Sequence, residues 1–74
     1  MKKSLAARIL SRTIQNHDTR VIKIKTISGK EYIFLKDEML FRIKNFIKPV
    51  LIINTKNNEI EILCKEIVSI QATR

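Results

Sequence analysis

The chain has 74 residues, with fifteen Lys and Arg against seven Asp and Glu and a formal net charge of +8 at pH 7. A chain of this length holds one domain, and its modest core supplies only about 3–5 kcal/mol of stability. One Cys and one His exclude an internal disulfide and a four-ligand zinc site. We therefore expect no metal and no cofactor. Self-association is the remaining source of additional stability, so we expect a homo-oligomer.

The positive charge is concentrated in the N-terminal third. Residues 1–25 carry seven basic residues and one acidic residue, whereas residues 51–74 carry three of each. Such asymmetry favours a polyanionic partner, of which nucleic acid is the commonest. General solubility and attraction to a membrane surface are alternatives that composition leaves open.

The N-terminus does not read as an export signal or a membrane segment. No apolar stretch approaches the roughly 18 residues needed to span a bilayer. The chain begins with two lysines, as a signal peptide does, but Arg8 and Arg12 interrupt the apolar region that should follow. The single thiol, Cys64, suits the reducing cytoplasm, where we expect the protein to reside.

Residues 2–16 are expected to form an amphipathic helix within an N-terminal segment 1–17. At about 100° per residue, apolar side chains fall on one broad face. This face comprises Leu5, Ala6, Ile9, Leu10, Thr13 and Ile14. Basic and small polar residues, including Arg8 and Arg12, cluster on the opposite face.

Residues 20–36 change to the period of two that is typical of strands. Ser28-Gly29 interrupts this alternation and supplies a hairpin turn, because Gly accepts the positive φ that tight turns need. The return strand carries apolar side chains on both faces. We therefore expect the hairpin to lie in a closed sheet.

Residues 37–49 fit two patterns. Asp37 can cap a short helix within 37–47 that buries Leu40, Ile43, Phe46 and Ile47. The segment 41–44 also alternates as a strand would. We favour the helix.

The C-terminal third predicts three strands and a sharp corner. Residues 50–53 are a compact apolar strand, residues 55–58 are turn formers, and Cys64-Lys65-Glu66 interrupts the final apolar runs. Five short strands hide their edges by curling into a small barrel, and such an interruption is where a strand turns its corner. We expect a single domain, 1–74, that is mainly β, in which a five-stranded, strongly bent SH3-like barrel occupies residues 20–74.

The order of these elements resembles the Sm-like family, and in particular the Hfq RNA chaperones. The hairpin IKIKTISGK resembles the family's first strands, and VLIINTKNNEIEILCKEIVSIQATR resembles its last two. Within CKEIVSIQ, Lys65 and Ser69 match the family's Tyr-Lys-His-Ala-Ile-Ser-Thr directly. The resemblance implies a strongly bent barrel that assembles into a ring by pairing edge strands.

The same resemblance implies roles for individual residues. Lys65 would be the inner-pore lysine that contacts U-rich RNA, and Arg8 falls near a helix position that contacts the same RNA. Lys25 stands where many members carry an aromatic residue for purine stacking, and Glu66 replaces the family's histidine. The chain also lacks the family's rim arginines and its second-strand glycine.

No constellation of catalytic residues is evident. His17 and Asp18 lie in a polar turn, Cys64 falls on the apolar face of its strand, and one glycine cannot form a phosphate-binding loop. We expect a protein that is not an enzyme.

We expect a nucleic-acid-binding protein, and specifically single-stranded RNA binding by an Sm-like, ring-forming barrel that acts in RNA regulation. RNA is favoured over DNA. The side chains expected to contact RNA are Arg8, Arg12, Lys23, Lys25, Tyr32 and Lys65. Tyr32 and Phe34 could instead pack in the core.

The alternative is a small adaptor or inhibitor, of the kind that mobile elements encode, that binds an acidic protein surface. Its signature would be an exposed apolar patch around Met39, Leu40, Phe41 and Phe46.

Overall fold

The computed structural model describes residues 1–45 and 47–74. Within these residues one helix precedes six strands, and two short 3-10 turns separate pairs of strands. The helix is α1 (Lys3–Gln15), and the strands are β1 (Val21–Thr26), β2 (Glu31–Leu35), β3 (Met39–Lys44), β4 (Val50–Thr55), β5 (Glu59–Leu63) and β6 (Ile67–Thr73). The 3-10 turns are η1 (Lys36–Glu38), between β2 and β3, and η2 (Cys64–Glu66), between β5 and β6.

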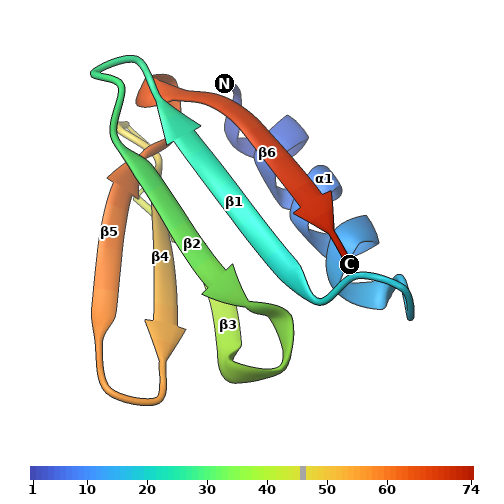
Figure 1. Cartoon of the computed structure of the whole chain (residues 1–74). Coiled ribbons are helices and arrows are strands. Elements are labelled where there is room, and N and C mark those ends of the chain that lie inside the picture. Colours follow the sequence, from blue (N-terminus) through green and yellow to red (C-terminus); the bar gives the residue numbers. More distant parts are fainter. Residues whose placement is uncertain (46) are drawn as a thin grey trace.

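The strands form two antiparallel three-stranded sheets (Figure 1). The order in the first sheet is β2-β1-β6, and the order in the second is β3-β4-β5. The predicted mainly-β fold with an N-terminal helix is confirmed. Among the described residues no strand of one sheet is paired with a strand of the other, so backbone pairing does not close a barrel.

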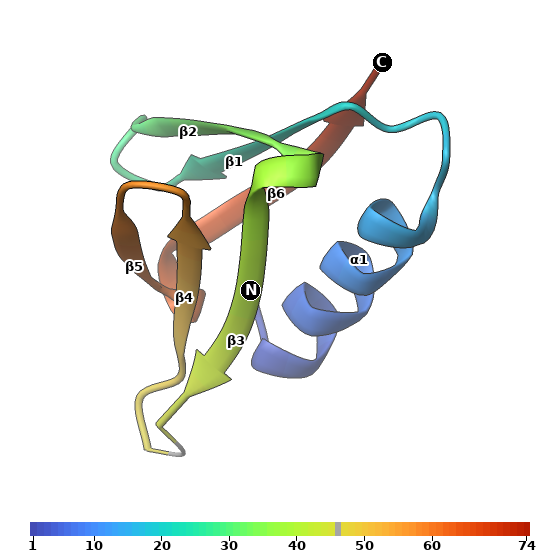
Figure 2. The same cartoon turned by 90° about the horizontal axis from the view of Figure 1, so that it is seen from below.

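Helix α1 forms as its periodicity predicts. Ala6 and Leu10 are fully buried, while Arg8 and Arg12 are exposed on the opposite side. Figure 2 shows α1 beside β3 and β6, which are edge strands of the two sheets. Leu10 thereby reaches the core between the sheets, where it joins side chains from both. The helix therefore lies against one edge strand of each sheet.

The hairpin of β1 and β2 is confirmed, with Gly29 at φ 85° in its turn. Its inner face carries Ile22 and Ile24, which are buried. Backbone pairing among the described residues does not form the closed sheet expected for this hairpin. Ile33 and Leu35, on the outer face of β2, are 66% and 53% exposed, because none of the described elements covers that side of the sheet.

The short helix expected within residues 37–47 is wrong. Asp37 lies in η1, which ends at Glu38, and Met39–Lys44 forms β3, which pairs along its whole length with β4. Met39, Phe41 and Ile43 alternate toward the core, whereas Leu40, which the helical pattern would bury, is 76% exposed. Pairing with β4 therefore outweighs the helical spacing. This segment also raises the strand count from the five expected to six. Phe46 lies outside the described residues.

The corner predicted at Cys64-Lys65-Glu66 is confirmed as η2. The chain leaves the second sheet at Leu63 and enters the first at Ile67. Cys64 and Ile67, at the start and just beyond the end of this turn, are buried, while Lys65 is exposed. A tight corner thus anchors its apolar residues in the core and directs its lysine outward.

Shortening Leu10 should undock α1. We expect Leu10→Ala to lower the free energy of unfolding by about 3 kcal/mol, because it removes a fully buried side chain from the core. Leu5→Ala, at a position 36% exposed on the same helix, should lower it by less than about 1 kcal/mol. Urea unfolding followed by circular dichroism measures both. Equal losses would mean that α1 is not held through Leu10.

Candidate nucleic-acid interface

Lysines from separate parts of the chain gather around η2. An open pocket of about 660 Å³ lies between the start of α1 and this turn. Its lining residues are Met1, Lys2, Lys3, Ser4, Pro49, Cys64 and Lys65. We call it the η2 pocket. Its walls are mainly apolar, and its lysines come from both ends of the sequence.

A second, smaller pocket lies on the other side of Pro49 and Lys65. It measures about 320 Å³ and is lined by Ile47, Lys48 and Leu63 together with those two residues. Lys65 therefore stands between two hollows and can reach a ligand in either. Lys48 adds another positive charge to the same end of the molecule.

Hydrogen bonds fix the framework of the η2 pocket. The Cys64 amide donates to the Pro49 carbonyl at 3.0 Å, which ties η2 to the connection between β3 and β4. The amino group of Met1 donates to the carbonyls of Cys64 at 2.9 Å and Ile67 at 3.2 Å. The start of α1, the residues before β4 and η2 are thus held together by backbone groups.

Cys64 contributes to the pocket as an apolar surface. Its side chain is buried, and this desolvation raises the pKa of the Cys64 thiol above its ordinary value of 9.0. The nearby amino-terminal charge and a backbone hydrogen bond from Leu51 act in the opposite direction but do not reverse the shift. The group is accordingly a neutral thiol at neutral pH, which suits packing better than nucleophilic chemistry.

The predicted RNA-contacting residues do not share one surface. Arg8 and Arg12 are exposed on α1, whose other side enters the core. Lys23 and Lys25 alternate with Ile22 and Ile24 and so lie on the outer face of the first sheet. Lys65 stands apart from both groups, at η2. Lys23 also pairs with Glu31 at 3.4 Å, which offsets part of its charge.

Tyr32 is partly buried against the core, and its ring lies beside the side chains of Phe34 and Lys30. Its ring is parallel to that of Phe34, with centroids 6.4 Å apart, and the ammonium of Lys30 lies 4.9 Å from its centroid. Phe34 is 5% exposed. The aromatic pair therefore serves chiefly as core packing, which leaves little ring surface for a base.

Sequence reasoning singled out Lys65 but missed Lys2, Lys3 and Lys48 as its neighbours. The adjacent lysines at positions 2 and 3 were visible, as was the lysine before Pro49. Nothing in their spacing connects them with position 65. The packing of α1 beside η2 brings Lys2 and Lys3 close, and the hydrogen bond between Cys64 and Pro49 brings Lys48 close.

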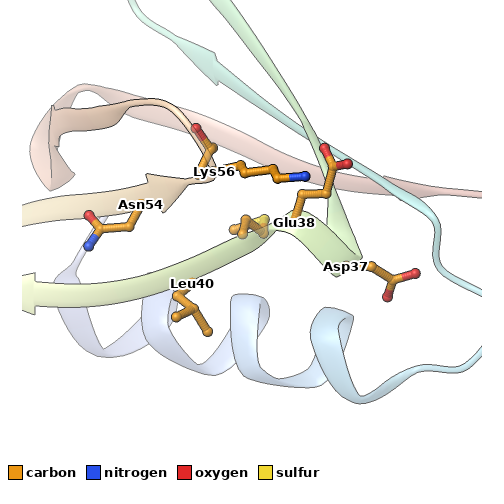
Figure 3. Close-up of a pocket in the computed structure, with 7 residues that line it drawn as sticks. Asp37, Glu38, Leu40, Asn54 and Lys56 are labelled. Atoms are coloured by element: carbon orange, nitrogen blue, oxygen red, sulfur yellow. The ribbon is translucent and has the colours of Figure 1, made fainter.

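The opposite end of the second sheet has a pocket whose lining includes acidic residues (Figure 3). A pocket of about 580 Å³ is bounded there by η1, β3 and the end of β4. It is lined by Asp37, Glu38, Met39, Leu40, Asn54, Thr55 and Lys56. Figure 3 shows Lys56 extending toward Glu38, and Asp37 pointing away from both. An anion is therefore favoured at the η2 pocket over this one.

The exposed apolar patch expected around residues 39–46 is not formed by its described members. Met39 is 5% exposed, and Phe41 is half-buried against the core. Leu40 alone of the three is largely exposed. Phe46 was part of this expectation and lies outside the described residues. Among its described members, the patch that would distinguish the adaptor hypothesis is reduced to Leu40.

Asp18 forms an ion pair with Arg74 at 3.7 Å, and His17 beside it is exposed. Within residues 1–45 and 47–74 there is no group of three potential metal-ligating His, Cys, Asp or Glu side chains. The described part of the chain also has no helix long and apolar enough to cross a membrane.

Comparison with known proteins gives no relative. No protein-family model, no curated protein and no solved structure matches the chain. The resemblance to Sm-like proteins therefore stays a prediction.

Burial should protect the thiol that lines the η2 pocket. We expect iodoacetamide to alkylate Cys64 at least about tenfold more slowly in the folded protein than in urea, at about pH 8. Folding raises the pKa of the Cys64 thiol. The contribution of the neutral thiol to the free energy of unfolding is therefore fully present below pH 9.0, the ordinary pKa, and is lost as the pH rises through the higher pKa of the folded state. Mass spectrometry follows the reaction, with Cys64→Ala as the unlabelled control. Equal rates in both states would contradict the burial.

Proposed function

We propose that this protein binds single-stranded RNA at the η2 pocket and acts in RNA regulation without catalysing a reaction. The observation that carries the proposal is the convergence of Lys2, Lys3 and Lys65 around an apolar floor of Met1, Pro49 and Cys64. Lys48 extends the positive surface beyond Lys65. A chain of net charge +8 adds a long-range attraction for polyanions.

The composition of the pocket supports single strands over duplexes. Lysine ammonium groups neutralise phosphates, and an apolar surface accepts the face of an unstacked base. A duplex keeps its base faces stacked inside the helix, so it would use the lysines alone. RNA with flexible, unpaired segments therefore makes the fuller set of contacts.

We also propose that the fold is a small relative of the Sm-like barrel. Support comes from the path of the chain, which changes sheets at η1 and again at η2. If β2 and β3 are counted as one strand bent at η1, the order of elements becomes a helix followed by five strands. This order is the one that the resemblance implies.

Reversing the charge at position 65 should weaken binding. We expect Lys65→Glu to lower the affinity for a single-stranded oligouridine by about tenfold or more, and Lys65→Gln to reduce the steepness of the salt dependence by roughly 0.7 in log–log slope. Lys56→Glu makes the same charge change at the opposite pocket and should have a much smaller effect. Fluorescence anisotropy at several salt concentrations measures these quantities, with oligoadenosine, the matching DNA and a duplex as comparisons.

Equal losses in Lys65→Glu and Lys56→Glu would show that binding follows net charge and has no site at η2. Failure of the unmodified protein to bind any of these nucleic acids at low salt would overturn the proposed function itself.

A further inference from the structure

The two sheets have four edge strands, and α1 lies against two of them. β2 and β6 border the first sheet, while β3 and β5 border the second. Figures 1 and 2 both show α1 beside β6, and Figure 2 shows it beside β3. The outer edges of β2 and β5 have neither a paired strand nor the helix beside them, within the described residues. An unpaired edge is a template for another strand.

The edge of β5 is protected by charge. The Thr55 amide donates to the Asn58 carbonyl and the Cys64 amide to the Pro49 carbonyl, which sets the hydrogen-bonding phase of this pair of strands. In that phase the outward backbone groups belong to residues 59, 61 and 63. Glu59 and Glu61 carry exposed side chains there. Glu59 is paired with Arg42 at 3.0 Å, whereas Glu61 would lie opposite Glu61 of a second copy paired about that residue, and the two carboxylates would repel one another.

The edge of β2, in contrast, is mainly apolar. The Thr26 amide donates to the Lys30 carbonyl and the Lys36 amide to the Arg20 carbonyl, so the even-numbered residues of β2 bond to β1. The outward amides and carbonyls therefore belong to Glu31, Ile33 and Leu35. Two of these three side chains are apolar, and Ile33 and Leu35 are 66% and 53% exposed. Neither Pro nor a charged residue interrupts the strand at these two positions.

We propose that two copies of this chain pair through β2, antiparallel, about a two-fold axis at Ile33. Ile33 of one copy then lies opposite Ile33 of the other, and Glu31 lies opposite Leu35 of the other copy. Each of these pairs exchanges two backbone hydrogen bonds, and the two sheets merge into one sheet of six strands. The exposed isoleucine and leucine of both copies form one continuous surface across the axis.

A second copy suits this edge because the strand complements itself. The register keeps outer side chains opposite outer side chains, so no residue must change face. An isologous contact of this kind also closes on itself and leaves no edge of β2 free. A 74-residue domain with a small core gains support from such pairing.

The electrostatics of this contact predict an unusual salt dependence. Each copy carries a net charge of +8, and the two-fold axis brings Lys30 near Lys36 of the second copy. Lys36 is held by a hydrogen bond to the Asn16 carbonyl at 2.9 Å, and Lys30 lies over Tyr32. Added salt screens the remaining repulsion, so association should strengthen as salt rises. RNA binding should weaken over the same range.

The test is the solution mass of nuclease-treated protein, measured by light scattering and sedimentation equilibrium up to about 0.5 mM chain and from about 0.05 to about 0.5 M NaCl. We expect the mass to rise toward twice the 8.7 kDa of one chain, and to do so more readily at high salt. Ile33→Pro removes an outward amide that makes no bond to β1, and it should restore the single-chain mass. Ile33→Thr keeps the amide and should retain the dimer.

A second pair of variants guards against misfolding. The double variant Ile33→Lys/Leu35→Lys should be monomeric with an unchanged circular dichroism spectrum, while Leu40→Lys, at a position 76% exposed on β3, should remain dimeric. Lys65→Glu should also dimerise, which separates this contact from RNA binding. A monomer under every condition, a dimer unaffected by both the proline and the double-lysine variants, or a ring of several chains would each overturn the proposal.

Discussion

The corner at η2 is the constraint on which both the core and the candidate site depend. Here the chain leaves one sheet for the other within three residues, and Cys64 and Ile67 are buried in the process. The Cys64 amide bonds to the Pro49 carbonyl, and the Cys64 carbonyl accepts the amino group of Met1. The same residue thus joins both sheets and the start of α1. Lys65, the next residue, is exposed because its neighbours are anchored.

Charged side chains are distributed unevenly over the molecule. Three ion pairs occur among the described residues, between Lys23 and Glu31, Arg42 and Glu59, and Arg74 and Asp18. Such exposed pairs contribute little to stability, and they offset part of the charge of Lys23, Arg42 and Arg74. The lysines around the η2 pocket face a largely apolar surface, whereas the pocket at η1 contains Asp37 and Glu38. The two ends of the second sheet therefore differ in the ligands they favour.

Edge strands present the second constraint on a domain of this size. Helix α1 contributes Leu10 to the core and also lies beside β3 and β6. One amphipathic helix therefore both completes the core and covers two edge strands. β5 carries two glutamates, but β2 exposes Ile33 and Leu35 beside unpaired backbone groups. The basic surface at η2 and the apolar edge at β2 lie on different elements of the fold. Substitutions at η2 and at β2 can therefore test the two proposals independently.

Local periodicity determined α1, the hairpin at Gly29 and the corner before Ile67, because each is encoded by residues adjacent in the chain. Residues 39–44 carried both helical and strand spacing, and pairing with β4 decided between them. The exposure of Ile33 could not be foreseen, since it depends on which face of the sheet another layer covers. Lys65 was identifiable, but its association with Lys2, Lys3 and Lys48 was decided only when packing brought distant segments together around η2. Sequence spacing specifies which side chains share a face of one element, whereas a site built from several elements exists only after their packing has fixed the distances between them.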